Sequence, residues 1–197
     1  MDTLPFSQAC ENNKDFILEN LSRVFAVSER VLEIGSGTGQ HAVHFAGHLP
    51  HLLWQPTELA QHLPVTLPRV EAYPGSNLLP VQVLDVCERP WTLPAVDAVF
   101  SANTLHIMPF AAVEALFAEL ESWASAGTVL AIYGPFNYGG RYTSDSNARF
   151  DQWLAERDPA SAIRDFEAVD SLARSAGFSL EEDNAMPANN RLLVWRK

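Results

Sequence analysis

Three glycines alternate with two small polar residues in a short run of the sequence, Gly35-Ser36-Gly37-Thr38-Gly39. The β-rich run Arg30–Ile34 leads into them, and a helical pattern begins after them. Glycine has no side chain, so a ligand can approach the backbone here, and the start of the following helix offers it N–H groups. A tight strand-to-helix turn without a ligand is the alternative. The position of the run after a first strand favours a ligand-binding loop.

The spacing of the glycines separates two kinds of cofactor site. A dinucleotide-binding loop carries G-x-G-x-x-G, in which the third glycine packs the helix against the strand. Counted from Gly35, that third position holds Gln40, and the glycines follow G-x-G-x-G instead, with Glu33 just before them. The spacing therefore disfavours an NAD-dependent oxidoreductase, which we keep as the least favoured alternative function.

Acidic residues also stand at the ends of the next two expected strands. Glu58 ends the second strand, where a carboxylate can accept hydrogen bonds from the hydroxyl groups of a ribose. Asp85 lies at the end of the third strand. A solvated Glu58 and an ordinary strand-end Asp85 are the alternatives. Together with Glu33, these acids would lie at the carboxyl edge of one sheet, where open α/β folds bind their ligands.

Strands and helices must position these residues, and hydrophobic periodicity predicts where they lie. Short β-rich runs cover residues 30–34, 52–58, 81–86, 95–101, 128–134, 178–183 and 191–196. Helical patterns cover residues 8–25, after an N-cap at Ser7, and 38–48, 59–72, 110–124, 146–156 and 165–176. The alternation predicts an α/β, Rossmann-like fold with a mostly parallel seven-stranded sheet, helices on both faces and a C-terminal antiparallel hairpin.

The composition suits one soluble domain over residues 1–197. The chain is 47% hydrophobic, so it can bury a core, and its formal net charge of −11 argues against nucleic acid as a partner. Its two cysteines, Cys10 and Cys87, are expected to be free thiols. No run reaches the roughly 18 apolar residues that a membrane span needs, and the first residues lack a signal-peptide pattern. We expect a cytoplasmic protein without a membrane partner.

The segment Val31–Gln40 resembles the first motif of class I methyltransferases that use S-adenosylmethionine (SAM). The resemblance implies that SAM is the cofactor, that the glycine loop passes under its methionyl part and ribose, and that Glu33 orients the loop or the amino acid group. It also implies that Asp85 binds the adenine amine, with the backbone of Val86 contributing. The cofactor-binding residues expected on these grounds are Glu33, Gly35, Ser36, Gly37, Thr38, Gly39, Glu58, Asp85 and Val86.

A longer set of segments resembles the methyltransferase-like protein 26 type family, whose function is poorly characterised. The resemblance covers most of the chain through Phe6-Ser7, Asn13-Lys14, Val31–His41, Trp54-Gln55-Pro56, Ala102-Asn103, His106-Ile107, Tyr133-Gly134-Pro135-Phe136, Ser146-Asn147 and Phe150-Asp151. The chain departs from the family pattern at Gln8, Asn12 and Thr57. The resemblance implies the SAM fold and no particular substrate.

Methyl transfer from a sulfonium needs an aligned acceptor atom, and it needs a base only where that atom must lose a proton. Polar and aromatic residues after the fourth and fifth strands are expected to line the acceptor site: Asn103, His106, Tyr133, Phe136, Asn137 and Tyr142. We assign His106, Tyr133 and Asn103 to catalysis, with His106 as the base. A structural histidine and a core tyrosine are the alternatives.

The N-terminal helical segment, residues 1–28, is expected to act as a lid, with the acceptor site between it and the loops after the fourth and fifth strands. Asn13 and Lys14 would then face the pocket, whereas a solvated helix start is the alternative. His44 and His48 stand one helical turn apart, as metal ligands do, but no third ligand is evident and we expect no metal.

These patterns predict a SAM-dependent methyltransferase that acts on a small-molecule acceptor. The main alternative is a non-catalytic module that binds SAM or a nucleoside and acts through a partner.

Overall fold

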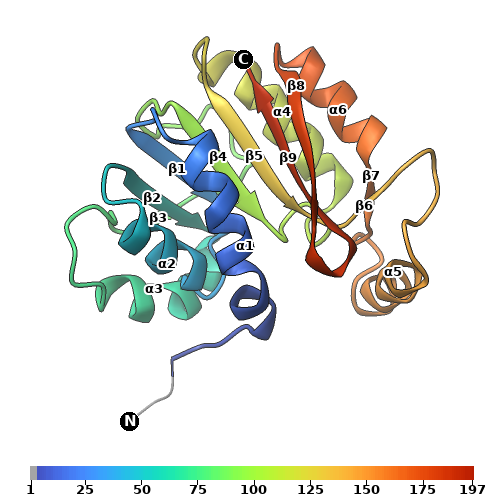
Figure 1. Cartoon of the computed structure of the whole chain (residues 1–197), viewed down its shortest axis with the longest axis horizontal. Coiled ribbons are helices and arrows are strands. Elements are labelled where there is room, and N and C mark those ends of the chain that lie inside the picture. The colour runs from blue at the N-terminus through green and yellow to red at the C-terminus, as the bar shows by residue number, and fades with distance from the viewer. Residues whose placement is uncertain (1–3) are drawn as a thin grey trace. The chain divides into compact units, whose positions relative to one another are not determined.

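Seven strands form one sheet in the computed structural model, which describes residues 4–197 (Figure 1). Their order is β3-β2-β1-β4-β5-β9-β8, and β6 and β7 form a separate two-stranded pair. The strands are β1 Arg30–Ile34, β2 Leu53–Glu58, β3 Gln82–Val83, β4 Ala98–Ala102, β5 Val129–Gly134, β6 Phe136–Asn137, β7 Arg164–Asp165, β8 Ser179–Met186 and β9 Asn190–Arg196. The Rossmann-like fold class is confirmed.

Helices form close to their predicted positions. They are α1 Gln8–Val24, α2 Gln40–His48, α3 Leu63–Glu71, α4 Phe110–Trp123, α5 Asp145–Arg157 and α6 Phe166–Ser175, with short 3₁₀ turns η1 Ala60–His62 and η2 Pro187–Asn189. The Ser7 hydroxyl caps α1 by accepting a hydrogen bond from the N–H of Cys10, as the sequence predicts. Ser144 caps α5 in the same way through Asn147.

The chain divides into two compact units, which we describe one at a time. The first comprises the chain up to Asp85 together with Val96–Phe100, and the second comprises Val86–Ala95 and Ser101–Lys197. The boundary passes through β4. The single-domain organisation expected from the length stays a prediction.

In the first unit, β1 lies parallel to β2, and β2 lies parallel to β3. The pairing of Ile34 with Thr57 brings the carboxyl ends of β1 and β2 to the same edge. Helix α2 contacts α1, α3 and β2 (Figure 1). The rings of Phe45, Trp54 and Phe100 contact one another and form the centre of this core. Apolar packing therefore fixes the end of β1, which leads into the glycine loop, and the end of β2, where Glu58 lies.

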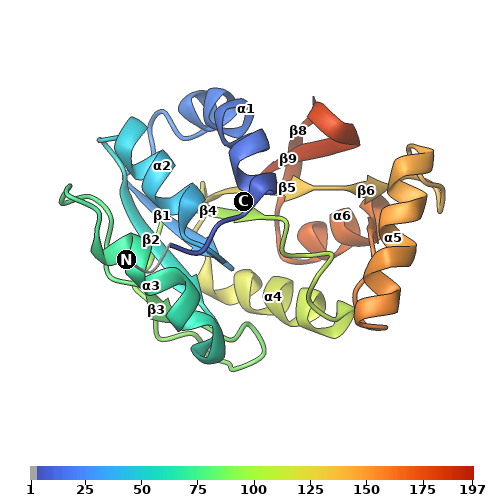
Figure 2. The same ribbon diagram turned by 90° about the horizontal axis from the view of Figure 1, so that it is seen from below.

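In the second unit, β9 runs antiparallel to both β5 and β8, which confirms the predicted C-terminal hairpin (Figure 1). Gly134, the last residue of β5, pairs with Arg191 near the start of β9. The turn of the hairpin therefore lies at the carboxyl end of β5. Helices α4 and α6 pack side by side (Figure 2). The indole of Trp195 on β9 donates to Asp170 on α6 at 2.9 Å, which ties this helix to the hairpin.

Three strands differ clearly from their predicted lengths. β8 extends to Met186 rather than ending at residue 183. β3 is confined to Gln82–Val83 rather than residues 81–86, and both of its residues are exposed. β4 begins at Ala98 rather than residue 95. The side chain of Asp97 instead accepts hydrogen bonds from the N–H groups of Glu29 and Arg30, at the start of β1.

None of the helices within residues 4–197 is long and apolar enough to cross a membrane. Cys10 and Cys87 are not joined in a disulfide. Part of the expected lid, residues 1–3, lies outside the described residues.

Candidate functional site

All three glycines of the loop after β1 have positive φ angles, 74° at Gly35, 55° at Gly37 and 72° at Gly39. This left-handed region favours glycine. A Cβ at Gly39 would lie 3.3 Å from the carbonyl oxygen of Thr66, so this glycine lets α2 approach α3. A Cβ at Gly37 would meet no atom within 4 Å. Gly39 therefore serves packing, whereas the space beside the Gly37 backbone holds no protein atom.

Glu33 is buried directly beneath this loop, with 2% of its surface exposed. Its Oε2 accepts hydrogen bonds from Ser36 Oγ at 2.9 Å and from Trp54 Nε1 at 3.0 Å. Burial raises the pKa of Glu33 to about 7, with a contribution from the negative charge of Glu58, while the two hydrogen bonds oppose the rise. Glu33 thus orients the loop through Ser36.

Glu58 is also buried, with 7% exposed, so the solvated alternative is wrong. Its Oε2 accepts a hydrogen bond from the backbone N–H of Gly37 at 2.7 Å, and its Oε1 accepts one from Leu59 at 2.8 Å. His62 Nδ1 lies 3.6 Å from the same Oε1. The structure therefore brings Glu58, Glu33 and the glycine loop together in the first unit.

Asp85 lies two residues beyond the end of β3 rather than within a strand. The segment nevertheless follows β2 to its end, because the N–H of Leu84 donates to the carbonyl oxygen of Glu58 at 3.0 Å. Asp85 is half-buried and Val86, the first residue of the second unit, is buried. An adenine-binding role for these two residues stays a prediction.

Gln40 connects the glycine loop to the N-terminal segment, a role that the sequence analysis missed. Its Oε1 accepts hydrogen bonds from the N–H of Ser7 at 2.6 Å and from the hydroxyl of Thr38 at 2.9 Å. Its Nε2 donates to Ser7 O at 3.3 Å and to Glu11 Oε1 at 2.7 Å. The residue that replaces the third glycine of a dinucleotide loop is therefore a polar cross-link. In the sequence, the only sign of this role was that Gln40 stands where the G-x-G-x-x-G pattern has its third glycine.

Helix α3 supports the loop from another side. Thr66 donates its hydroxyl to the carbonyl oxygen of Gly37 at 2.6 Å. Arg69 donates to the carbonyl oxygens of Thr38 at 3.1 Å and of Pro5 at 2.6 Å. These bonds were not expected, because the prolines in this segment weakened its helical pattern. They link the N-terminal segment, the loop and α3 through backbone oxygens.

Asn13 on α1 is more buried than a residue at a solvated helix start would be. Asn13 is buried, and its Oδ1 lies 2.7 Å from His41 Nε2. Burial lowers the pKa of His41 to about 4. Lys14 forms an ion pair with Glu11. Asn13 and Lys14 therefore contact α2 and α1 residues, and whether either faces a ligand stays a prediction.

A histidine pair on α2 does not form part of a metal centre in the described chain. The rings of His44 and His48 have centroids 4.4 Å apart, and His48 Nδ1 contacts the carbonyl oxygen of His44. Within residues 4–197, no three His, Cys, Asp or Glu side chains are grouped so that they could hold a metal ion.

In the second unit, the structure joins Asn103 to Tyr133. Asn103 follows β4 with a φ of 56°, and its N–H donates to the carbonyl oxygen of Tyr133 at 2.9 Å. A positive φ at a non-glycine residue is uncommon and is concentrated at functional sites. Tyr133 is only 2% exposed within β5, as a core tyrosine would be. The bond fixes the Asn103 backbone against the end of β5.

His106 lies at the carboxyl end of β5 in the same unit. Its Nδ1 would be 3.6 Å from a Cβ placed at Gly134, and its ring packs edge-on against Phe150. Burial lowers the pKa of His106 to about 4, and the positive charge of Arg164 adds to the effect. The imidazole is therefore uncharged at neutral pH.

Arg164 holds the loop that carries His106. Its guanidinium donates to the carbonyl oxygens of Leu105, Met108 and Ala160. The Ser161 hydroxyl donates to Ile107 O at 2.7 Å. This clamp keeps His106 in one position, and no sequence motif pointed to it.

The other three residues expected at the acceptor site differ in their surroundings. Phe136 is fully buried and belongs to the core. Asn137 has a buried Oδ1 without a hydrogen-bond partner among the described residues. Tyr142 is 47% exposed and donates its hydroxyl to Asp151 at 2.7 Å. Of these three, Asn137 alone offers an unused polar group.

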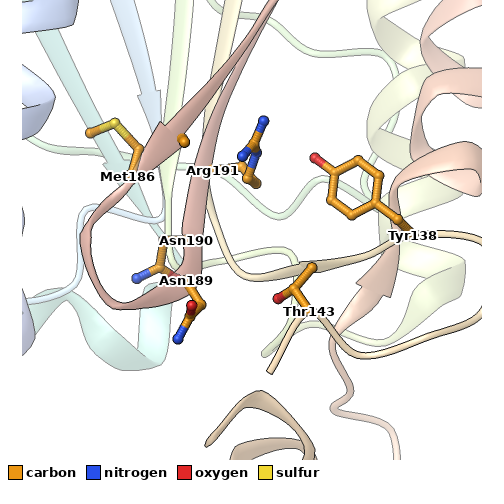
Figure 3. A pocket seen from close by; sticks show the side chains of 7 residues that line it. Tyr138, Thr143, Met186, Asn189, Asn190 and Arg191 are labelled. Carbon is orange, nitrogen blue, oxygen red and sulfur yellow. The ribbon is translucent and has the colours of Figure 1, made fainter. Parts of the chain in front are cut away.

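A pocket of about 400 Å³ opens near the turn of the β8–β9 hairpin, which the sequence analysis did not anticipate (Figure 3). Its walls come from the segment after β5 and from the hairpin: Tyr138, Thr143, Ala185, Met186, Asn189, Asn190 and Arg191. Its residues are far apart in sequence, and the antiparallel pairing of β5 with β9 brings them together.

A family model matches nearly the whole chain. It represents the family described as protein of unknown function (DUF938), and it matches residues 4–197. The chain belongs to the DUF938 family.

Solved structures similar to this DUF938 chain share its fold. An O-methyltransferase family protein from Burkholderia thailandensis is 16% identical, covering 93% of this chain and 56% of its own, with a TM-score of 0.79. An O-methyltransferase family 2 protein from Planctomyces limnophilus, solved with apigenin, is 15% identical over 96% and 57%, with a TM-score of 0.80. Human N-acetylserotonin methyltransferase, solved with SAM, is 15% identical over 96% and 58%, with a TM-score of 0.70. The DUF938 chain thus spans little more than half the length of these proteins.

Proposed function

We propose that this DUF938 chain is a SAM-dependent methyltransferase that acts on a small-molecule acceptor. The observation that carries the proposal is the arrangement around Gly37, where open space lies beside a glycine whose N–H is bonded to Glu58. Glu33 orients the same loop from below. The fold shared with a SAM-bound human methyltransferase and an apigenin-bound O-methyltransferase supports this choice of cofactor and acceptor.

The residues of the first unit fit the chemistry of SAM. Open backbone at Gly37 suits the close approach of a ligand, and the carboxylate of Glu58 can accept hydrogen bonds from ribose hydroxyls. We assign the cofactor to a set drawn from the loop and the neighbouring strand ends: Glu33, Gly35, Ser36, Gly37, Thr38, Gly39, Glu58 and Asp85. When bound, SAM supplies a methyl group on an already activated sulfonium.

We assign the acceptor chemistry to residues of the second unit. His106 is uncharged at neutral pH, so it can accept a hydrogen bond or a proton from an acceptor hydroxyl. Its low pKa makes it a weak base, which suits an acceptor that loses its proton easily. Asn103 and Tyr133 would orient the acceptor, since positioning is the main requirement of methyl transfer.

We also propose that the chain is of the methyltransferase-like protein 26 type. In the same proposal the N-terminal segment acts as a lid, and its hydrogen bonds to Gln40 and Arg69 support this role. A cytoplasmic location stays a prediction.

Calorimetry tests the choice of cofactor. SAM and S-adenosylhomocysteine should bind, and NADH should not. Tighter binding of NADH than of SAM would overturn the proposal.

The weakness of His106 as a base favours one second candidate, a SAM-binding module without transferase activity. A broad metabolite screen with labelled SAM separates the two functions. Methylation of any small molecule favours the enzyme, whereas retained SAM binding without methylation favours the module.

A further inference from the structure

The pocket at the β8–β9 hairpin has the dimensions of a ligand site. Its volume of about 400 Å³ lies within the roughly 300–1,000 Å³ typical of small-molecule pockets. The pairing of Gly134 with Arg191 places it at the carboxyl end of β5. Ligands of open α/β folds bind at this end of the strands.

The charged lining of the pocket wall is of one sign, positive. Among the lining residues, Arg191 is the only charged one, and neither an aspartate nor a glutamate contributes. Thr143 and Asn189 add side chains that can donate hydrogen bonds. Tyr138 and Ala185 supply apolar surface, whereas the side chains of Met186 and Asn190 point to the other face of the hairpin (Figure 3). The wall therefore suits a ligand with an anionic oxygen-bearing group and an apolar body.

Arg191 is held in place from behind. Its Nε donates to Asp183 Oδ1 at 2.6 Å, and its Nη2 donates to the backbone oxygen of Asp183 at 2.8 Å. The other carboxylate oxygen of Asp183 accepts the hydroxyl of Tyr138 at 2.8 Å. Figure 3 shows the guanidinium of Arg191 and the hydroxyl end of Tyr138 facing one another across the pocket.

This arrangement prepares Arg191 for a ligand. The bonds to Asp183 engage two of the five N–H groups of the guanidinium, which leaves donors for a bound group. The side chain has already lost its rotational freedom, so binding costs less entropy. Burial and the neighbouring Asp183 raise the pKa of Tyr138, so this phenol stays protonated and remains a donor to Asp183.

We propose that this pocket binds the carboxylate of a small molecule, with Arg191 as its anchor. Guanidinium groups bind carboxylates through paired N–H donors, and amide and hydroxyl side chains complete such sites. The apolar body of the ligand packs against the ring of Tyr138, which shares this side of the hairpin with Arg191 (Figure 3). The further assignment of this ligand as the methyl acceptor rests on the proposed function.

Benzoate is the test ligand for the pocket. Calorimetry measures its affinity and backbone-amide NMR locates its binding site, and the uncharged benzamide is the matched probe for the role of the carboxylate. Benzoate should shift the amide signals of Thr143 and of residues 189–191, and benzamide should bind at least tenfold more weakly. Arg191→Gln should weaken benzoate binding at least tenfold. Benzoate shifts elsewhere, or equal affinity for benzamide, would overturn the proposal.

The same hairpin offers a matched control. Arg196 on β9 forms a similar cross-strand pair, with its Nε 2.8 Å from Glu181 Oε1, but it does not line the pocket. Arg196→Gln should leave benzoate affinity within twofold of the parent. Equal losses in Arg191→Gln and Arg196→Gln would mean that the charge of the hairpin, and not the pocket, attracts benzoate.

A second variant guards against loss of folding in Arg191→Gln. Asn189 has a φ of 58°, a conformation that glycine adopts easily, so Asn189→Gly should fold and lose only the amide. We expect benzoate binding to weaken at least threefold, and unchanged binding would contradict the assigned wall.

These measurements need no cofactor. Benzoate binding without SAM binding would sustain the pocket and sink the proposed function, and SAM binding without benzoate binding would do the reverse.

Discussion

The carboxylate of Glu58 accepts a hydrogen bond from the backbone N–H of Gly37 at 2.7 Å. The bond joins the end of β2 to the middle of the glycine loop. Each carboxylate oxygen has a second lone pair, so Glu58 can hold the loop and still accept hydrogen bonds from a ribose. In the proposed SAM site, this one side chain would couple the shape of the loop to ligand binding.

Replacing Glu58 should weaken SAM binding. Glu58→Ala removes a charged acceptor, and we expect a loss of about 1–3 kcal/mol measured by calorimetry. Glu58→Gln keeps the shape and one oxygen and should lose less. The fold should survive in both variants, as checked by thermal unfolding. An unchanged dissociation constant in Glu58→Ala would assign this residue to loop structure alone.

Filling the space at Gly37 should abolish SAM binding. Gly37→Val places a branched side chain where no protein atom lies within 4 Å. Gly127→Val is the matched control, because Gly127 also has a positive φ, 89°, and open space around it. The control also places valine at a positive φ and should bind SAM normally in calorimetry. Equal SAM affinity in both variants would remove Gly37 from the binding site.

Glu33 should make stability depend on pH. Its pKa is about 7 in the folded chain against an ordinary value of 4.5, so the folded state holds the proton more tightly. The stabilisation is complete below pH 4.5 and is lost as the pH rises through 7. A shift of this size corresponds to about 3 kcal/mol. In Glu33→Gln, the free energy of unfolding should not show this decrease as the pH rises.

Urea unfolding at pH 5 and pH 8 measures the effect of Glu33. The free energy of unfolding of Glu33→Gln, relative to the parent, should rise by about 2–3 kcal/mol between the two pH values. The comparison cancels any constant cost of the substitution. A pH-independent difference would mean that Glu33 is ionised throughout.

His106→Ala should spare the cofactor and impair turnover. We expect SAM affinity within twofold of the parent and a turnover lower by roughly 10²-fold once an acceptor is known. Since the pKa of His106 is about 4, the acid limb of the parent's rate profile should lie near pH 4. The exposed His48→Ala is the control and should change neither quantity. Normal turnover in His106→Ala would exclude the histidine as a base.

Tyr133→Phe should also lower turnover, but by less than His106→Ala does. Loss of one hydroxyl should lower turnover by about tenfold and leave SAM affinity intact. Because Tyr133 is buried in β5, the thermal stability of the Tyr133→Phe variant must be measured together with its turnover. A loss of stability with normal turnover would show a core role only.

The sequence by itself determined the elements and the loop. Apolar runs bounded by turn residues located the strands, and the alternation with helices predicted the Rossmann-like sheet and its C-terminal hairpin. The glycines at 35, 37 and 39 predicted a loop between the first strand and the next helix, and the structure has such a loop, in which all three have positive φ. These features depend on spacing along the chain, because backbone conformation and one-sided burial repeat with the period of the local structure.

Only the tertiary structure decided how the side chains are paired. Gln40 reaches Ser7 and Glu11 across a long stretch of sequence, and its type gave no indication of that. The raised pKa of Glu33 arises from burial beneath the loop, which no local pattern encodes. The pocket around Arg191 exists because β9 pairs with β5 and closes on the segment that follows it. Contacts between distant residues depend on the packing of the whole unit, so spacing alone could not predict them.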